Sequence, residues 1–180
     1  MKTFSRIAIA MLTMSTVAVA QPKSDKATVP PELIDMAKAV TGTWKCKGES
    51  FERDGSKVAI TATNRVKADL DKWWIAGTMD VKGMKTPFKM VTYTTYDAAS
   101  KKWRRIGLDN EGAHMIGTAD ATPMGQPMVF NLDTLGPMGG GQFRDHVDPS
   151  DLKAGLKAWG EMSTDKGKSW TKVYAMTCKK

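Results

Sequence analysis

The side chains best able to do chemistry in this sequence are scattered rather than grouped in a motif. His114 and His146 are the only histidines, and they are not spaced as a pair of metal ligands. Each is interpreted as an ordinary strand or surface histidine. The alternative interpretation is a single ligand to haem or to a metal ion. The sequence has no Gly-x-Ser-x-Gly elbow, and the glycine run 139–141 is not followed by the Lys-Ser or Lys-Thr pair of a phosphate-binding loop. We therefore predict no catalytic residue, no metal site and no cofactor.

Polar residues that meet only after folding are a second route to catalysis. An active site would form if several of them converged at one end of the fold, within hydrogen-bonding reach of each other. An enzyme of this kind stays open as an alternative hypothesis. The residues concerned are Arg105, Asp109, His114, Arg144 and His146.

Soft apolar side chains are the most distinctive feature of the composition. The chain has 13 methionines, ten of them beyond residue 20, and six tryptophans. Methionine adapts to irregular shapes and aromatic rings offer broad contact surfaces, so a cavity lined by both suits a flexible hydrophobic ligand. The alternative is that these side chains simply fill the core. Copper binding by thioethers is a further interpretation, which the dispersed methionines do not favour.

The first twenty residues have the pattern of a secretory signal peptide. Lys2 and Arg6 form a basic start, residues 7–20 are apolar or small, and Ala18-Val19-Ala20 is a small-x-small cleavage site. The apolar part is too short for a transmembrane helix, so we predict no transmembrane segment. Cleavage near Ala20 predicts a periplasmic or secreted protein, with a flexible tail at residues 21–30 and a single domain at residues 31–180.

The chain is moderately basic. Its formal charge is +8, and the loss of Lys2 and Arg6 with the leader reduces it to +6. The lysines come singly or in pairs rather than in a helix-long stripe, so nucleic-acid binding is not predicted. A solvated cationic surface is the simplest interpretation, and attraction to anionic envelope components is the functional one.

Cys46 and Cys178 are the only cysteines. An exported protein with two cysteines more often pairs them than leaves two free thiols, which predicts a disulfide. Because Cys46 lies in the first predicted strand and Cys178 in the last, the bond would join the two ends of the fold.

One helix and up to ten strands are expected after the leader. Apolar residues at helical spacing follow Pro31, and Gly42 suits the end of that helix. From Thr43 onward, short runs rich in Val, Thr, Tyr, Trp and Phe alternate with turn residues, which is typical of an all-β fold. The glycine- and proline-rich stretch 120–141 is expected to be a long loop or a lid around one short strand. The strands are predicted near residues 43–50, 58–68, 72–81, 86–96, 101–108, 112–119, 127–133, 142–147, 153–163 and 169–178.

Alternation within the strands predicts which side is interior. In the third strand, Trp73, Ile75 and Met79 share the more apolar face, and both cysteines lie on the more apolar faces of the terminal strands. If those strands are neighbours, the sheet closes into a small antiparallel barrel of about 8–10 strands. A ligand cavity would then be lined by Trp44, Trp73, Ile75, Met79, Phe88, Met90, Met128, Phe130, Trp170 and Tyr174.

Three short motifs carry a family resemblance. The start Gly42-Thr43-Trp44 resembles the Gly-x-Trp opening of lipocalin and calycin barrels. Together with Thr95-Tyr96-Asp97 and the late Ser163–Trp170 hairpin, it is similar to the secreted bacterial proteins grouped as domain of unknown function 1579. The resemblance implies a lipocalin-like barrel and brings no activity with it.

Binding of a small hydrophobic or amphipathic molecule in the barrel, without catalysis, is the leading hypothesis. An envelope-associated interaction protein with a packed core and the enzyme described above are the alternatives. The ligand, any protein partner and the oligomeric state do not follow from the sequence.

Overall fold

A computed structural model describes residues 27–180 apart from residues 53, 138 and 152. The signal peptide predicted at residues 1–20 and the first part of the predicted tail, residues 21–26, lie outside the described residues. Residues 27–30 have no regular secondary structure and lead directly into the first helix.

The predicted helix is present as α1 (Pro31–Val40). Pro31 occupies the first turn, where its missing N–H leaves no hydrogen bond unmade, and Glu32 lies beside it at the positive end of the helix dipole. The helix ends where the N–H of Thr41 bonds the carbonyl of Ala37, and Gly42 follows with a positive φ of 136°. A chain reversal of this kind favours glycine.

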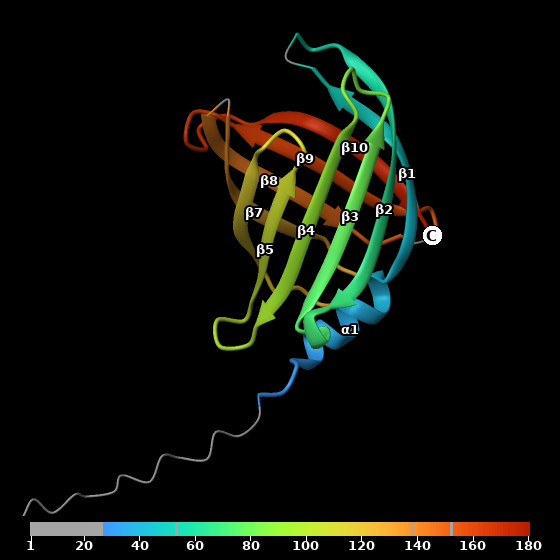
Figure 1. Cartoon of the computed structure of the whole chain (residues 1–180), viewed down its shortest axis with the longest axis vertical. Helices are drawn as coiled ribbons and strands as arrows, with labels where there is room; N and C mark the ends of the chain where they lie inside the picture. Colours follow the sequence, from blue (N-terminus) through green and yellow to red (C-terminus); the bar gives the residue numbers. More distant parts are fainter. Residues whose placement is uncertain (1–26, 53, 138, 152) are drawn as a thin grey trace, which may run out of the picture.

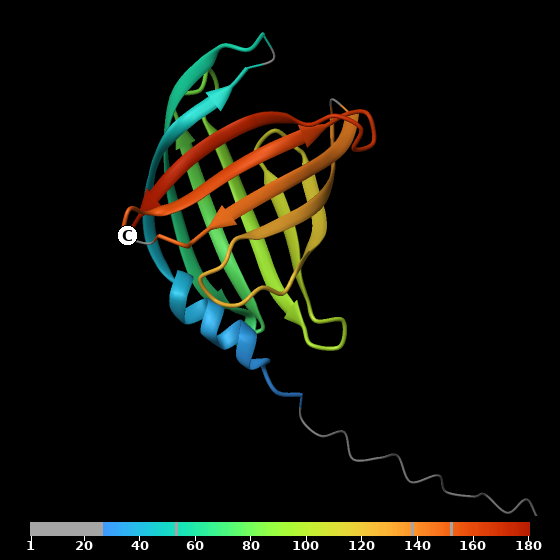
Figure 2. The ribbon, with the colours of Figure 1, turned by 180° about the vertical axis from the view of Figure 1, so that it is seen from behind.

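All strands of the described chain pair antiparallel with their neighbours, and the sheet closes on itself (Figures 1 and 2). This confirms the predicted all-β barrel, and each predicted strand matches an observed strand to within a few residues at its ends. The strands are β1 (Gly42–Phe51), β2 (Lys57–Asp69), β3 (Trp74–Lys82), β4 (Phe88–Asp97), β5 (Lys102–Asp109), β6 (His114–Asp120), β7 (Met128–Gly136), β8 (Gly139–Asp148), β9 (Leu156–Ser163) and β10 (Thr171–Lys179), with a short 3-10 turn η1 (Leu70–Lys72) before β3.

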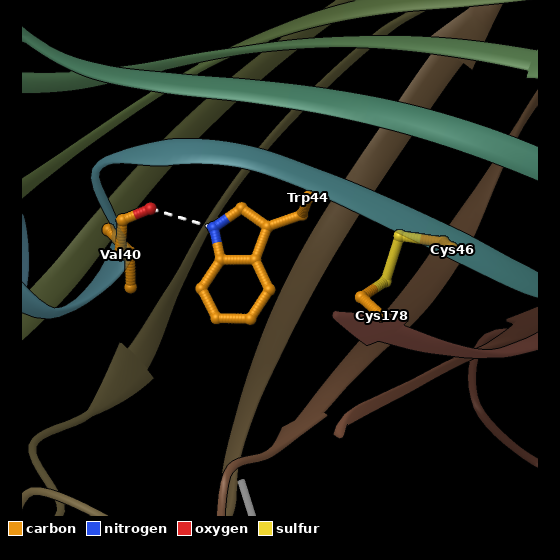
Figure 3. The surroundings of a disulfide bond; sticks show 4 residues. All are labelled: Val40, Trp44, Cys46 and Cys178. Atoms are coloured by element: carbon orange, nitrogen blue, oxygen red, sulfur yellow. Dashed lines mark hydrogen bonds between the residues drawn. A yellow bond between two sulfur atoms is a disulfide. The ribbon is translucent and has the colours of Figure 1, made fainter. Parts of the chain in front are cut away.

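Closure occurs between the first and last strands. In the pairing of β1 with β10, Cys46 is directly opposite Cys178, and a disulfide joins them (Figure 3). The predicted disulfide is thus confirmed, and it links strands 132 residues apart in sequence. Beside it, the indole nitrogen of Trp44 donates a 2.8 Å hydrogen bond to the carbonyl of Val40, which ties the start of β1 to the end of α1.

One end of the barrel is closed by α1, which lies across it (Figure 1). Leu33 is fully buried there, within a cluster that includes Tyr96, Trp103 and Phe130. The other helix residues that pack on this cluster are only partly buried. Since the helix buries its apolar side against the barrel interior, it forms part of the core rather than an appendage.

Three details differ from the predictions. Residues 139–141 belong to β8, so the expected 120–141 loop shrinks to the connection between β6 and β7, because the glycines pair in the ladder opposite β7. Trp73 precedes β3 and caps η1, so it is not on the interior face of a strand. The β10 ladder shifts register between Lys172 and Tyr174, which breaks the alternation that had placed Trp170 with Tyr174.

The hairpin at Ser163–Trp170 is built as a structural turn. The carboxylate of Asp165 accepts hydrogen bonds from the N–H groups of Lys168 and Ser169 and from the hydroxyls of Ser163 and Ser169. The Ser169 and Ser163 hydrogen bonds lower the Asp165 pKa to about 2, since they favour the charged carboxylate. Gly167 adopts a positive φ of 82°, as the turn requires.

Candidate functional site

A charged cluster crosses the interior of the barrel. The Arg105 guanidinium on β5 donates from Nη1 to the Asp145 carboxylate on β8, and the Tyr174 hydroxyl on β10 donates to the other oxygen of the same carboxylate. Arg105 Nε also donates a 3.1 Å hydrogen bond to Thr94 Oγ1 on β4. We call these four residues the interior polar cluster.

Strand alternation and register bring these side chains together. Arg105 is two residues beyond the buried Trp103 and therefore faces inward with it. Asp145 is directly opposite Phe130 in the β7–β8 ladder, and the guanidinium carbon of Arg105 lies 3.6 Å from the centroid of the Phe130 ring. The cluster is thus held by four strands and by a cation–π contact.

Gly160 makes room for Tyr174. It is opposite Tyr174 in the β9–β10 ladder and opposite Asp145 in the β8–β9 ladder. A Cβ at this position would lie 2.3 Å from the Tyr174 ring and 2.5 Å from the Phe143 ring. Without the glycine, the tyrosine could not lie flat against the strand and reach the carboxylate.

The cluster is largely removed from water. The side chains of Arg105 and Asp145 are 17% and 16% exposed. Burial raises the pKa of the Tyr174 phenol well above its usual value of 10.0, and the Asp145 charge raises it further, so the hydroxyl remains a hydrogen-bond donor at neutral pH.

The guanidinium retains donors that the described protein does not use. Arginine has five N–H groups, and the hydrogen bonds above account for Nε and one N–H of Nη1. No acceptor for Nη2 is found among residues 27–180 outside the three gaps, and none of the buried side-chain nitrogens or oxygens there lacks a partner. The free N–H groups of Arg105 therefore face space that a water-sized molecule can enter.

Inward-facing side chains differ in burial along the barrel. Side chains near α1 are buried, as at Trp103 and Phe130. By contrast, several that also point inward further along the strands are only half-buried, although ladder register places them inside. Burial at the end opposite α1 is uneven, because Val81, directly opposite Phe88 in the ladder, is buried. These half-buried inward residues include Phe88, Met90, Met115, Phe143 and Met162.

The structure places the predicted cavity residues as follows. Eight lie on inward-facing positions of their strands, and two do not. Trp73 lies in the turn before β3, and Trp170 lies in the β9–β10 hairpin, where its indole nitrogen bonds the carbonyl of Gly167 and the outward Arg144 covers its ring at 3.8 Å. The inward eight are Trp44, Ile75, Met79, Phe88, Met90, Met128, Phe130 and Tyr174.

The polar residues considered for an active site do not converge. Arg105 is in the interior, whereas Asp109 accepts hydrogen bonds from the N–H groups of Glu111 and Ala113 in its own turn. His114 is exposed, and Arg144 alternates outward with His146. His146 stacks on Trp159 with ring centroids 4.6 Å apart and lies 3.1 Å from a Glu161 oxygen.

Sequence reasoning missed Asp145, the residue on which the cluster depends. The signal was available in the alternation of β8, where Phe143, Asp145 and Val147 share one face. That pattern becomes informative only with the register against β7, which places Asp145 opposite an inward phenylalanine.

The described residues contain no group of three or more His, Cys, Asp or Glu side chains arranged to hold a metal ion. None of their helices has the length and apolar character needed to cross a membrane.

Fold and site together define a closed antiparallel barrel with a helix at one end and a polar cluster inside. A crystal structure of Rv2717c from M. tuberculosis has the same fold, with a TM-score of 0.63 and 12% sequence identity over 85% of this chain and 99% of that one. At this identity the likeness concerns the fold alone. No family model and no curated protein matches the chain, and the resemblance to domain of unknown function 1579 stays a prediction.

Proposed function

We propose that this protein is a binding protein that holds a small amphipathic molecule inside its barrel, without covalent chemistry. The apolar part of the ligand would lie against the inward methionine and aromatic side chains. Its polar end would accept hydrogen bonds from Arg105. The observation that carries the proposal is a guanidinium inside an apolar barrel with N–H groups that the described protein does not use.

The form of the interior supports this proposal. Ligand sites in proteins are mostly apolar and contain a few polar groups that fix the ligand's orientation. Here the polar groups come from four strands and are already held in place by Asp145, Thr94 and Tyr174, so little ordering is left for ligand binding to accomplish. Asp145 also balances the arginine charge. The acceptor on the ligand therefore need not be a carboxylate and can be uncharged or weakly charged.

The disulfide supports a role outside the cytoplasm. Disulfides form and persist in oxidising compartments and are rare in reducing ones. We therefore propose a periplasmic or secreted location, and cleavage of the predicted leader near Ala20 is tested by mass spectrometry of the exported protein.

Ligand binding is tested with tryptophan fluorescence. The inward-facing Trp44 and Trp103 lie within the two core clusters and should report a bound molecule. We expect saturable changes with a panel of aliphatic carboxylates and alcohols of different chain lengths, and weaker changes with the matching alkanes, which lack an acceptor. Native mass spectrometry of protein purified from its own host should show a co-purifying small molecule.

The matched variants are Arg105→Gln and Arg104→Gln. Both lie on β5, but Arg104 points outward and pairs with Asp97 at the surface. We expect Arg105→Gln to weaken binding of the polar ligands about tenfold, since a hydrogen bond from a charged donor is lost, and Arg104→Gln to leave it unchanged. The proposal fails if no panel member binds and the native spectrum contains the bare protein alone.

A further inference from the structure

A regular row of lysine and threonine crosses the outer surface of five neighbouring strands. In the ladders, Lys157 on β9 is opposite Thr177 on β10, Thr177 is opposite Lys47 on β1, Lys47 is opposite Thr61 on β2, and Thr61 is opposite Lys82 on β3. The order across the sheet is therefore Lys-Thr-Lys-Thr-Lys. We call these five residues the lysine–threonine row.

The spacing within this row is set by the sheet. Neighbouring strands lie about 4.8 Å apart, so the backbone positions of the lysines recur about every 10 Å, with a threonine between each pair. The threonines keep the lysines from being direct neighbours, and each lysine side chain is exposed. None of the three forms an ion pair within the described chain, whose salt bridges involve other lysines.

A second set of cations lies beside the row. Lys45 is directly opposite Lys179, and like charges in this position destabilise a sheet. Lys45 Nζ reaches Thr63 at 3.2 Å rather than an acid. Asp80, the nearby carboxylate, is engaged by Arg65 at 2.8 Å. Positive charge therefore predominates around Lys45, Lys47 and Lys179, whereas at the β9 end of the row Asp148 lies directly opposite Lys157 and offsets part of its charge.

This surface is also hollowed. A groove of about 1040 Å³ runs over β10, β1, β2, the end of β3 and the start of β4, and its lining includes Lys45, Lys47, Lys82 and Thr61. A smaller hollow of about 350 Å³ continues from Lys47 to Lys157. The two hollows share Lys47 and Thr177 in their linings and together include all five residues of the row, so a chain-like molecule could contact several strands at once.

We propose that the lysine–threonine row binds a linear acidic polysaccharide that carries one anionic group on every second sugar. Lysine acts as a point charge toward an anion, and the intervening threonine hydroxyls can exchange hydrogen bonds with the hydroxyls of the neutral sugars. Each sugar would then meet one strand. This inference is independent of the ligand proposed for the barrel interior.

The surface fits two other polyanions less well. Proteins that bind single-stranded nucleic acids stack the bases on aromatic side chains, and the row contains no aromatic residue. Trp159, the aromatic residue that borders the smaller hollow, is already stacked on His146. The row follows the curved wall of a closed barrel across five neighbouring strands, so a flat anionic membrane would meet only part of it. Complementarity of charge and of repeat length therefore favours the polysaccharide.

The experiment measures binding of the oxidised protein to hyaluronan oligosaccharides, which carry a carboxylate on alternate sugars, by calorimetry at low and at physiological salt. Polygalacturonate, polyphosphate, single-stranded DNA, dextran and vesicles containing anionic phospholipid are the comparison probes. We expect hyaluronan to bind more tightly than any of them and its affinity to fall as salt is raised, because screening weakens exposed charge contacts.

Variants of equal charge distinguish the row from general basicity. We expect the triple variant Lys47→Gln, Lys82→Gln, Lys157→Gln to bind hyaluronan about tenfold more weakly than the unmodified protein. The control triple removes three exposed lysines elsewhere and should stay within about twofold; it is Lys102→Gln, Lys153→Gln, Lys168→Gln. The pair Thr61→Val, Thr177→Val, which leaves the charge intact, should also weaken binding.

Each remaining outcome overturns the inference. These are the absence of hyaluronan binding, equal losses in the two lysine triples, no effect of the threonine pair, and tighter binding of a comparison probe. Circular dichroism of each variant confirms that the barrel is folded, and since all substitutions are at exposed positions, an unfolded variant would itself contradict the surface role assigned here.

Discussion

At the scale of single residues, the interior polar cluster is the feature that separates this barrel from a plainly apolar one. Burying Arg105 and Asp145 is tolerated because they neutralise each other and because Thr94 and Tyr174 supply further hydrogen bonds. Such a cluster contributes little net stability compared with apolar packing, but removing one member leaves its partner uncompensated. That asymmetry makes single substitutions informative.

Tyr174→Phe removes one hydroxyl from this cluster and little else. We expect the free energy of unfolding to fall by about 2 kcal/mol, because Asp145 loses a hydrogen bond in a site with little water. Urea unfolding followed by tryptophan fluorescence measures the change. Tyr93→Phe is the control, since Tyr93 lies on the outer side of β4 with its ring 6.3 Å from that of Trp74. An equal loss in both variants would contradict the role given to Tyr174.

The raised pKa of Tyr174 predicts that the stability of the fold depends on pH in the alkaline range. Its pKa is raised in the folded protein, so folding favours the protonated phenol. The contribution to stability is fully present below about pH 10, the pKa of the unfolded chain, and is lost as the pH rises toward the folded-state pKa. We expect the stability difference between the unmodified protein and Tyr174→Phe to be constant from pH 7 to about pH 9 and to narrow above about pH 10. A difference that widens there would show that the phenol ionises readily in the fold.

At the scale of elements, α1 has a defined structural task. The barrel needs a cover at one end, and the helix provides it with Leu33, which is fully buried among residues of β3 to β7. The preceding and following segments hold the helix in place, since Val29 packs on the same cluster and the Trp44 indole bonds the carbonyl of Val40. No helix covers the opposite end among the described residues, and the inward side chains there range from buried, as at Val81, to half-buried, as at Phe88 and Met90.

Leu33→Ala should therefore destabilise the protein by about 2–5 kcal/mol, through lost burial and the cavity left at the closed end. Ile34→Ala is the matched control on the same helix, because Ile34 is 38% exposed and should change the unfolding free energy by less than about 1 kcal/mol. Thermal unfolding by circular dichroism measures both. Similar losses in the two variants would mean that the helix does not insert Leu33 into the barrel in solution.

At the scale of the whole molecule, closure joins the two ends of the sheet. A barrel has no free edge strands, and here the seam lies between β1 and β10. The Cys46–Cys178 disulfide crosses that seam and encloses nearly the entire barrel sequence. The outer surface of the barrel differs between two regions. The surface over the seam is cationic, whereas β5, β6 and β7 carry exposed aliphatic side chains such as Leu108, Ile116 and Leu135.

Reduction of the disulfide should lower the free energy of unfolding by about 5 kcal/mol in the loop-entropy account, because the enclosed loop is long. The measurement is urea unfolding with and without dithiothreitol. The double variant Cys46→Ala, Cys178→Ala provides the control, since dithiothreitol should leave its transition unchanged. If the reductant has no effect on the unmodified protein, either the thiols are free or the bond contributes nothing to stability.

The sequence was most informative about secondary structure and the seam. Turn residues between β-forming runs predicted all the strand positions to within a few residues, and the cysteine pair joined the correct strands. Predictions failed where alternation was interrupted. Trp73 was assigned to a strand that begins one residue later, and Trp170 was assigned across a register shift that no local pattern reveals. Residues 139–141 were assigned to a loop because glycine weakens strand propensity, whereas pairing with β7 holds them in the sheet.

By itself, then, the sequence determined the antiparallel strands, the short helix before them and the cysteine pair, because these follow from local periodicity, turn chemistry and cysteine usage. The interior polar cluster and the lysine–threonine row were decided by tertiary structure alone. Both depend on which residues face each other across strands far apart in the chain. That register is set by barrel closure as a whole, and no local stretch of sequence contains it.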